Sequence, residues 1–290
     1  MDYRKLRRDD FKLKMLLGLG KTAQVYLAET PDGKEVALKL PRKEIREDER
    51  LAQMFEQEVR LSLGLKHPNL LRGFVGKPFG EGAFVALEYM PSGTLESALR
   101  QGKPSQEDAL SFIAQLASAL IYLHGRGIVH QDVKPANVFY DAKSKVVKLG
   151  DYGVARTKDN TKPFERAGSP FYMAPEIFRG ESAGPAADAY SLGVLAYELL
   201  TGRRPFYGDS YDALMAAHLT QAPPSLSRTG LDPKTQQRLQ GLLAKDPHRR
   251  TELDRLLRSL KGHYTVEKAP QVKKEQPTSS WLGKLLRRKK

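Results

Sequence analysis

One short segment, residues 130–137 (HQDVKPAN), places an acid, a base and an amide within six residues of one another. Asp132 could act as a general base, Lys134 could bind a phosphate, and Asn137 could offer an oxygen to a metal ion. Pro135 interrupts regular structure, so the segment is predicted to be a loop. Together these residues indicate phosphoryl-transfer chemistry, although any one of them could equally belong to an ordinary turn.

A second candidate is the glycine-containing turn at residues 18–25 (GLGKTAQV). Glycines between strands let backbone N–H groups approach phosphate oxygens. The dinucleotide-binding pattern is excluded because a strand, not a helix, follows the turn. The P-loop pattern is excluded because no Gly-Lys-Ser/Thr follows at the required spacing. A purely structural glycine hairpin stays open as the alternative.

A lysine follows this turn in an alternating strand that contains Ala37 and Lys39. Both side chains are predicted to point to the same face, beneath the glycine turn. A lysine on an apolar face needs an anionic partner. That partner could be a phosphate or a carboxylate from residues 55–58 (FEQE). The alternative is a surface lysine whose stem lies along the sheet and whose charge reaches water.

Two further motifs follow in the chain, Asp151-Tyr152-Gly153 and Ala174-Pro175-Glu176. With these five elements in this order, the sequence resembles the eukaryotic-like serine/threonine protein kinase family of the bacterial type, over residues 10–260. The resemblance implies an ATP-dependent kinase that phosphorylates Ser and Thr hydroxyls of proteins, including itself.

The resemblance assigns roles to individual residues. Lys39 would contact the α- and β-phosphates and pair with Glu58, while Asp132 would be the catalytic base and Lys134 its serine/threonine-type companion. Asn137 and Asp151 would hold Mg²⁺, with Mn²⁺ as the alternative metal. The residues implied in binding ATP are Gly18, Leu19, Gly20, Lys21, Ala23, Val25, Ala37, Lys39, Glu58, Leu87, Glu88, Met90 and Phe139.

Three positions depart from the family pattern. Ala23 replaces the third loop glycine, and Tyr152 replaces phenylalanine, which adds a hydroxyl that needs a partner. Gln131 replaces the arginine that binds an activation-loop phosphate in many members. We therefore expect basal activity without that phosphate. Because the implied catalytic residues are all present, a catalytically inactive binding scaffold is disfavoured. A small-molecule phosphotransferase is disfavoured because residues 168–176 resemble the segment on which serine/threonine kinases bind protein substrates.

The elements that must position these residues change character along the chain. Residues 11–40 and 84–88 indicate strands, 44–65 indicates a helix, and everything after about residue 185 is mostly helical. A capping box is predicted at residues 105–108 (SQED), ahead of a helix with an apolar stripe. The order predicts an α+β, bilobal fold with one main helix in a β-rich N-lobe and a larger helical C-lobe.

The expected domain boundaries follow from the resemblance and from composition. The kinase domain spans 10–260, with an N-lobe at about 10–88 and a C-lobe at about 91–260. A polar linker follows at 261–280, and residues 281–290 (WLGKLLRRKK) form a basic amphipathic tail. The tail could bind weakly to an anionic membrane or an acidic partner, and a disordered solubilising tail is the alternative.

Composition excludes several classes of protein. Apolar residues make up 40% of the 290-residue chain, enough for a core, and the absence of cysteine excludes disulfides and a cysteine nucleophile. The charged N-terminus and the lack of a long apolar run favour a cytoplasmic protein, which its tail could hold at the inner membrane surface. Half of the net charge of +14 lies in residues 261–290, so no specific nucleic-acid partner is expected.

Overall fold

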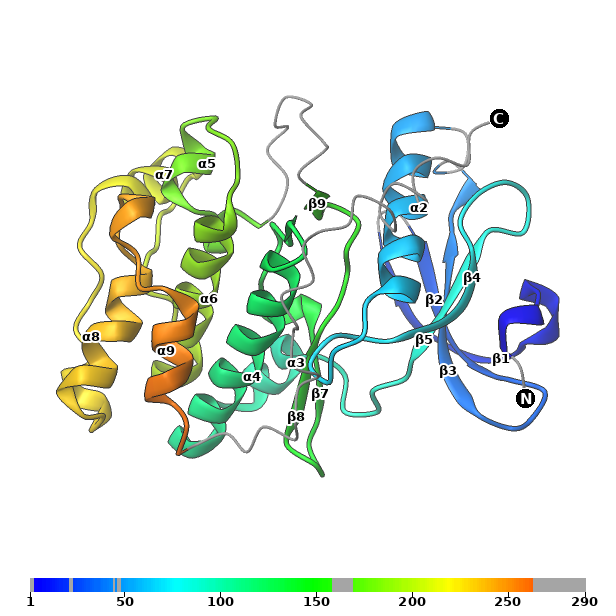
Figure 1. Cartoon of the computed structure of the whole chain (residues 1–290), viewed down its shortest axis with the longest axis horizontal. Helices are drawn as coiled ribbons and strands as arrows, with labels where there is room; N and C mark the ends of the chain where they lie inside the picture. Colours follow the sequence, from blue (N-terminus) through cyan, green and yellow to red (C-terminus); the bar gives the residue numbers. More distant parts are fainter. Residues whose placement is uncertain (1–2, 21–22, 44, 46–47, 158–168, 263–290) are drawn as a thin grey trace. The chain divides into compact units, whose positions relative to one another are not determined.

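The computed structural model describes residues 3–20, 23–43, 45, 48–157 and 169–262 (Figure 1). The described chain forms two compact units. The first contains Met1–His67 and Leu71–Tyr89, and the second contains Pro68–Leu70 and Met90–Glu267, each as far as it is described. The predicted α+β class, with a β-rich N-lobe that has one main helix and a helical C-lobe, is confirmed.

The first unit is built on a five-stranded antiparallel sheet of order β1-β2-β3-β5-β4. Its central strands are apolar on alternate residues, so Val36 and Leu38 are fully buried on one face while Lys39 points to the other. The strands are β1 (Lys12–Leu19), β2 (Ala23–Glu29), β3 (Glu35–Pro41), β4 (Gly73–Lys77) and β5 (Phe84–Glu88).

Helix α2 (Glu49–Gly64) packs against this sheet on the face that carries Lys39 (Figure 1). It begins at Asp48, whose side chain accepts a hydrogen bond from the Leu51 backbone N–H at 2.9 Å. The helix approaches β4 so closely that a Cβ at Gly73 would lie 2.8 Å from the Ser62 carbonyl oxygen. Glycine at this position therefore sets the distance between helix and sheet.

The opposite face of the sheet is covered by the N-terminal segment, which contains the short turns η1 (Tyr3–Lys5) and η2 (Arg8–Asp10) (Figure 1). Leu6 and Phe11 from this segment pack on a cluster of buried side chains. The buried members of that cluster are Phe11, Ala28, Val36, Leu38, Val75, Phe84 and Ala86.

The second unit is organised around two buried helices, α4 (Gln106–His124) and α6 (Pro185–Thr201), which pack on each other. A Cβ at Gly193 would lie 2.7 Å from the Leu242 Cβ, so the glycine lets α8 approach α6. The shorter helices around them are α3 (Leu95–Gln101), α5 (Pro175–Phe178), α7 (Tyr211–Thr220), α8 (Pro233–Leu242) and α9 (Leu253–Ser259).

Short strands and turns in this unit hold the loops that carry chemistry. Strand β6 (Ile128–Val129) pairs with β9 (Arg156–Thr157), and β7 (Val138–Asp141) pairs with β8 (Val146–Leu149). The turn η3 (Pro135–Asn137) lies directly before β7. The segment 130–137 is therefore held between a strand pair on each side.

One local prediction is wrong. Ser105 caps α4, accepting from the Asp108 backbone N–H at 3.0 Å, but the return bond of a capping box is absent from the described contacts. The Asp108 carboxylate instead accepts from Lys145 Nζ at 3.0 Å, because a residue distant in sequence offers a full positive charge. Residues 263–280 of the predicted linker and the predicted tail at 281–290 lie outside the described residues.

Candidate active site

In the first unit, Lys39 and Glu58 form an ion pair. Lys39 Nζ donates to Glu58 Oε1 at 2.5 Å, and the two side chains are only 13% and 6% exposed. Glu58 comes from the sheet-facing side of α2, whereas Glu56 pairs with Arg60 on the helix surface. The buried lysine thus has the carboxylate partner that its place in β3 demands.

Three other sequence-predicted residues of this unit, Val25, Ala37 and Leu87, lie on the same sheet face as Lys39. Val25 lies directly opposite Lys39, and Ala37 lies opposite Leu87, so all four side chains share one face. At the glycine turn, the Gly20 backbone N–H donates to the Ala23 carbonyl at 2.9 Å. Lys21 lies outside the described residues.

In the second unit, the segment that carries Asp132 is held by one buried carboxylate, Asp188 at the start of α6. Its Oδ2 accepts from the His130 backbone N–H, and its Oδ1 accepts from the Gln131 backbone N–H, both at 2.8 Å. His124 at the end of α4 lies 2.8 Å from Oδ2. Burial alone would raise the pKa of Asp188, but the hydrogen bonds and charge of its partners outweigh burial and lower that pKa.

The two oxygens of Asp132 have different surroundings. Oδ2 accepts from Lys134 Nζ and from Asn137 Nδ2, each at 2.7 Å. Oδ1 accepts only one long bond among the described contacts, from the Ser169 backbone N–H at 3.3 Å. Oδ1 is therefore the oxygen that is available to accept a proton or a hydroxyl hydrogen bond.

His130 joins this loop to the segment that carries Asp151. Its Nδ1 accepts from the Asp132 backbone N–H at 3.3 Å, so Nε2 carries the proton and donates to the Gly150 carbonyl at 3.1 Å. The Tyr152 ring packs edge-on against the His130 ring. Its hydroxyl donates to the Leu149 carbonyl at 3.1 Å, which supplies the partner that the extra oxygen of tyrosine needs.

Asn137 and Asp151 suit a divalent cation that also binds phosphate. The Asn137 side-chain NH₂ donates both of its hydrogens, one to the Asp132 backbone carbonyl at 2.9 Å and one to Asp132 Oδ2 at 2.7 Å. The Oδ1 atom of Asn137 is left as a ligand atom. Asp151 is exposed and has a left-handed backbone (φ 65°). No three His, Cys, Asp or Glu side chains in the described ranges form a metal site. A cation here would complete its shell from phosphate and water oxygens.

Comparison with known proteins identifies the family of this chain. A family model described as the protein kinase domain matches residues 11–260. The chain belongs to the protein kinase family. A serine/threonine-protein kinase of Corynebacterium efficiens is 33% identical over 83% of this chain and 48% of its own length. The serine/threonine-protein kinase PknJ of Mycobacterium tuberculosis is also 33% identical, over 83% of this chain and 43% of its own length.

The chain spans about half the length of the first of these curated relatives and somewhat less of the second. The Aurora kinase of Dictyostelium discoideum is 29% identical over 94% of this chain and 70% of its own length. Similarity therefore extends to eukaryotic kinases as well as bacterial ones. In the described part of this kinase, no helix is long and apolar enough to cross a bilayer.

Four residues from the predicted ATP-binding set have less informative surroundings. The Glu88 backbone N–H donates to the Arg72 carbonyl at 2.8 Å, and Met90 is buried at the start of the second unit. Phe139 is half-buried in β7 and forms an isolated antiparallel β-bridge with Thr94. Leu19 is 62% exposed, so no protein contact competes with a ligand for most of its surface.

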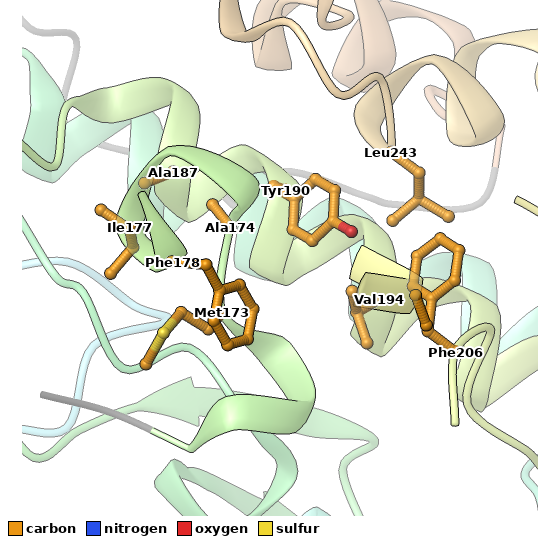
Figure 2. Close-up of a cluster of buried hydrophobic side chains, with 10 residues drawn as sticks. Met173, Ala174, Ile177, Phe178, Ala187, Tyr190, Val194, Phe206 and Leu243 are labelled. Atoms are coloured by element: carbon orange, nitrogen blue, oxygen red, sulfur yellow. The ribbon is translucent and has the colours of Figure 1, made fainter. Parts of the chain in front are cut away.

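Downstream of Ser169, the kinase chain is held by an ion pair and by a buried apolar cluster, the latter drawn in Figure 2. Glu176 accepts two bonds of 2.6 Å from the Arg250 guanidinium, and both side chains are almost fully buried. Figure 2 shows the apolar side chains of this region, with Tyr190 central among them. Members of the cluster are Met173, Ala174, Ile177, Phe178, Ala187, Tyr190, Val194, Phe206, Ala217 and Leu243.

A small pocket lies beside Asp132 in this unit. Its polar wall contains Gln131 and Ser169, and its apolar wall includes Met173 and Ile177. The Gln131 Nε2 atom is buried and has no hydrogen-bond acceptor among the described residues. Gln131 also has a left-handed backbone (φ 69°), which the two hydrogen bonds at Asp188 hold in place.

Sequence reasoning assigned no role to His124 or to Asp188. The polar bridge between Asn69 and Gln115 (2.8 Å) was missed as well. Each of these side chains acts on backbone groups or on another polar side chain, and none touches the reacting atoms. The only sequence signal for them was a polar residue at a position predicted to be buried.

Proposed function

We propose that this chain transfers the γ-phosphoryl group of ATP to Ser and Thr hydroxyls of protein substrates, itself included. The observation that carries the proposal is the Asp132 carboxylate: Lys134 and Asn137 hold one oxygen, and the other accepts only a long bond from the Ser169 backbone N–H among the described contacts. A pre-positioned acceptor of this kind is what in-line phosphoryl transfer requires of a protein.

In this mechanism each residue has a limited task. Asp132 Oδ1 accepts the hydrogen bond of the substrate hydroxyl, orients its oxygen and takes its proton. Lys134 is close enough to Asp132 to place a positive charge beside the transferred group, and Lys39, fixed by Glu58, binds the α- and β-phosphates. A bound Mg²⁺ would neutralise charge on the phosphates, with Asn137 and Asp151 as its protein ligands and Mn²⁺ as a substitute.

The adenosine and phosphates would be bound by the sheet face and the loops already described. The set is Gly18, Leu19, Gly20, Lys21, Ala23, Val25, Ala37, Lys39, Glu58, Leu87, Glu88, Met90 and Phe139. The shared face of Val25, Ala37 and Lys39 supports this assignment, because it combines apolar surface for a base with a cation for phosphate. The pocket beside Asp132 would accept a substrate side chain, and its apolar wall favours an apolar one.

For the whole chain we propose a kinase domain over 10–260, a linker over 261–280, and a basic tail over 281–290 that binds anionic membranes or acidic partners weakly. Four apolar residues in the tail, at i,i+4 spacing, and five bases support this. A cytoplasmic location stays a prediction. Trp281 is the only tryptophan, so its fluorescence reports directly on the tail. An unshifted Trp281 spectrum on phosphatidylserine vesicles at low salt would favour the disordered alternative.

The catalytic proposal is tested with radiolabelled ATP and a generic protein substrate. We expect Asp132→Asn to bind ATP as wild type but to lose at least about a hundredfold in kcat, since general-base catalysis contributes on the order of 10²–10⁴. A matched control is Asp141→Asn, an acid on β7 that hydrogen-bonds Ser144 and Lys143. Transfer by Asp132→Asn at the wild-type rate, or full activity in excess chelator, would contradict the mechanism.

A further inference from the structure

The pocket beside Asp132 has a polar group without a partner in its wall. Gln131 lines the pocket, and its side-chain Nε2 atom is buried with no hydrogen-bond acceptor. In the described part of the chain, only one other buried side-chain nitrogen or oxygen lacks a partner, His218 Nε2, which lies among aromatic rings. Buried polar groups in native proteins are nearly always paired, because an unpaired donor costs free energy. Gln131 therefore offers a hydrogen bond that the free protein does not use.

The position of Gln131 is fixed by its backbone. Its N–H donates to the buried carboxylate of Asp188 at 2.8 Å, and its left-handed conformation (φ 69°) is one that a non-glycine residue seldom adopts. The same carboxylate binds the N–H of the preceding residue, so the backbone cannot rotate to bring the side-chain amide to another acceptor without breaking two hydrogen bonds. The unpaired amide is therefore a fixed feature of the pocket, directly before Asp132.

Most of the remaining pocket wall is already hydrogen-bonded or apolar. Asp132 Oδ2 accepts two hydrogen bonds, and the Ser191 hydroxyl donates to the Tyr172 carbonyl at 2.7 Å. The Tyr172 hydroxyl donates in turn to Glu198. The aliphatic lining residues, several of which are drawn in Figure 2, are Val133, Met173, Ala174, Ile177, Ala183 and Ala187. A side chain that enters the pocket thus meets an apolar wall and the unused amide of Gln131.

We propose that Gln131 determines substrate specificity by pairing its side-chain amide with that of a glutamine or asparagine close to the phosphorylated Ser or Thr. The inference rests on the proposed function, in which the substrate hydroxyl lies at Asp132 Oδ1. Asp132 itself lines the pocket, and consecutive Cα atoms of a peptide are only about 3.8 Å apart. The side chain that enters the pocket therefore belongs to a residue about one or two positions from the phosphorylated one.

A primary amide is the group that best completes this pocket. Its carbonyl oxygen accepts from Gln131 Nε2 while its NH₂ donates back to Gln131 Oε1, so two amides that face each other form two hydrogen bonds. The pairing holds for either orientation of the Gln131 amide, because turning it over only exchanges donor and acceptor. The methylene groups of the substrate side chain lie on the apolar wall. The wall alone favours an apolar side chain, and the amide adds the requirement for a polar end.

Charge and hydrogen bonding disfavour other side chains. A carboxylate would bring a second negative charge next to Asp132. Lysine and arginine carry only donors, and these would face the donor of Gln131. Leucine and methionine fit the apolar wall but leave the buried Nε2 atom unpaired or nearly so, since the methionine sulfur is a weak acceptor. Serine and threonine can accept a hydrogen bond but lack the methylene stem that covers the wall.

Peptide kinetics test the pairing in the full chain. A library of peptides with one Ser and a scanned position on each side should show glutamine or asparagine favoured at a single position. At that position, wild-type enzyme should have a kcat/KM about tenfold higher for glutamine than for methionine, since the buried donor is fully paired only by glutamine. Gln131→Met should reduce this ratio to about one. The matched control Gln237→Met, at an exposed side chain of α8, should keep the wild-type ratio.

The ratio of two peptides on one enzyme cancels any effect of a substitution on the transfer step that both peptides share. Equal ratios in wild type and Gln131→Met would overturn the proposal, as would a wild-type preference for an acidic, hydroxyl or apolar side chain. Ala183→Leu narrows the pocket at a half-buried lining residue and should lower the kcat/KM for the glutamine peptide several-fold relative to a glycine peptide. An unchanged glutamine-to-glycine ratio would show that the side chain does not enter this pocket, and the proposal would fail.

Peptide binding separates this inference from the proposed catalytic function. A fluorescein-labelled peptide with alanine in place of the serine should bind wild type about tenfold more tightly with glutamine than with methionine, as measured by anisotropy. Gln131→Met should remove this difference. A binding difference without transfer to any peptide would refute the catalytic proposal and support the amide pairing. Transfer without any difference that depends on Gln131 would refute the amide pairing and support the catalytic proposal.

Thermal unfolding tests whether the amide is unpaired in the free protein. Gln131→Met removes the unpaired donor and fills a similar volume, so its Tm should equal or exceed that of wild type. The same measurement verifies that the variant folds. A Tm several degrees below that of wild type would show that the amide has partners within the protein and would overturn the proposal.

Discussion

Removal of one guanidinium from the second unit should expose the energetic cost of an unpaired buried charge. Arg250→Met removes the two 2.6 Å bonds to Glu176. It also removes three bonds to backbone carbonyls, from Nη1 to Ala186 at 2.8 Å, from Nε to Ala244 at 2.9 Å and from Nη2 to Lys245 at 3.5 Å. Methionine fills much of the volume, so the main loss is electrostatic. Glu176 stays 3% exposed, with its charge partner removed.

The size of the effect follows from this geometry. Breaking a buried ion pair by removing one partner costs about 3–5 kcal/mol, because the remaining charge is stranded. For a unit of this size that corresponds to a fall of roughly 10 °C in Tm. Adding Glu176→Gln to Arg250→Met removes the stranded charge, so the double variant should be more stable than Arg250→Met alone. The expected coupling energy is about 2 kcal/mol.

Urea unfolding followed by far-UV circular dichroism measures all four members of this double-mutant cycle. The matched control is Arg255→Met, because Arg255 pairs with Glu252 at 3.2 Å in an exposed position, where such pairs contribute about 0–1 kcal/mol. The reasoning is refuted if Arg250→Met costs less than about 1 kcal/mol, or if the two single effects simply add.

Three further predictions concern the same unit. Asp188→Asn should lower kcat at least about tenfold, with little change in the Tm of the first unit. The reason is that the NH₂ group of the new asparagine would face a backbone N–H donor that the carboxylate accepted. An unchanged kcat would contradict this. Burial, aided by the charge of Arg250, lowers the pKa of Lys245 to about 8 from its usual 10.5. Lys245→Met should therefore raise stability by about 1 kcal/mol below pH 8, allowing for its partial exposure, and this advantage should vanish by pH 10.5, as measured by Tm across that range. Phosphatase-treated enzyme should phosphorylate an exogenous substrate without a lag, because Gln131 cannot bind an activating phosphate; a lag that prior phosphorylation removes would show the opposite.

The sequence predicted the regular elements best where apolar residues follow a regular pattern within one continuous segment. The strand predicted at residues 84–88 matches β5, and the apolar stripe of α4 is buried as expected. Strand β4 was not predicted, because two glycines among its five residues conceal the alternation, and both are required by close packing. The capping box was wrong because Asp108 is used by Lys145, a contact across 37 residues that no local pattern contains.

The candidate site was predictable to the extent that its residues touch substrate. The resemblance implied Glu58 as the partner of Lys39, and the structure forms this pair, while Glu56 pairs with Arg60. The different surroundings of the two Asp132 oxygens were not predictable, since they depend on atom positions set by η3 and by Ser169. Ser169 contacts Asp132 through its backbone N–H, a contact that its side-chain type does not indicate.

The buried Asp188 shows why a charge is retained in the core at this position. Gln131 and Asp151 both have left-handed backbones, a conformation that costs a non-glycine residue about 1 kcal/mol or more. An ordinary loop would relax out of it. Asp188 receives two backbone N–H groups and His124 at once, which no neutral side chain of that size can do because only a carboxylate has acceptor sites on both oxygens and no donor. The lowered pKa of Asp188 has the same origin, because the donors around its oxygens stabilise the charged carboxylate. The charged carboxylate in turn holds those donors in place. The hydrogen bonds to Asp188 thereby offset the backbone strain at Gln131. This residue directly precedes Asp132, whose orientation the proposed reaction needs.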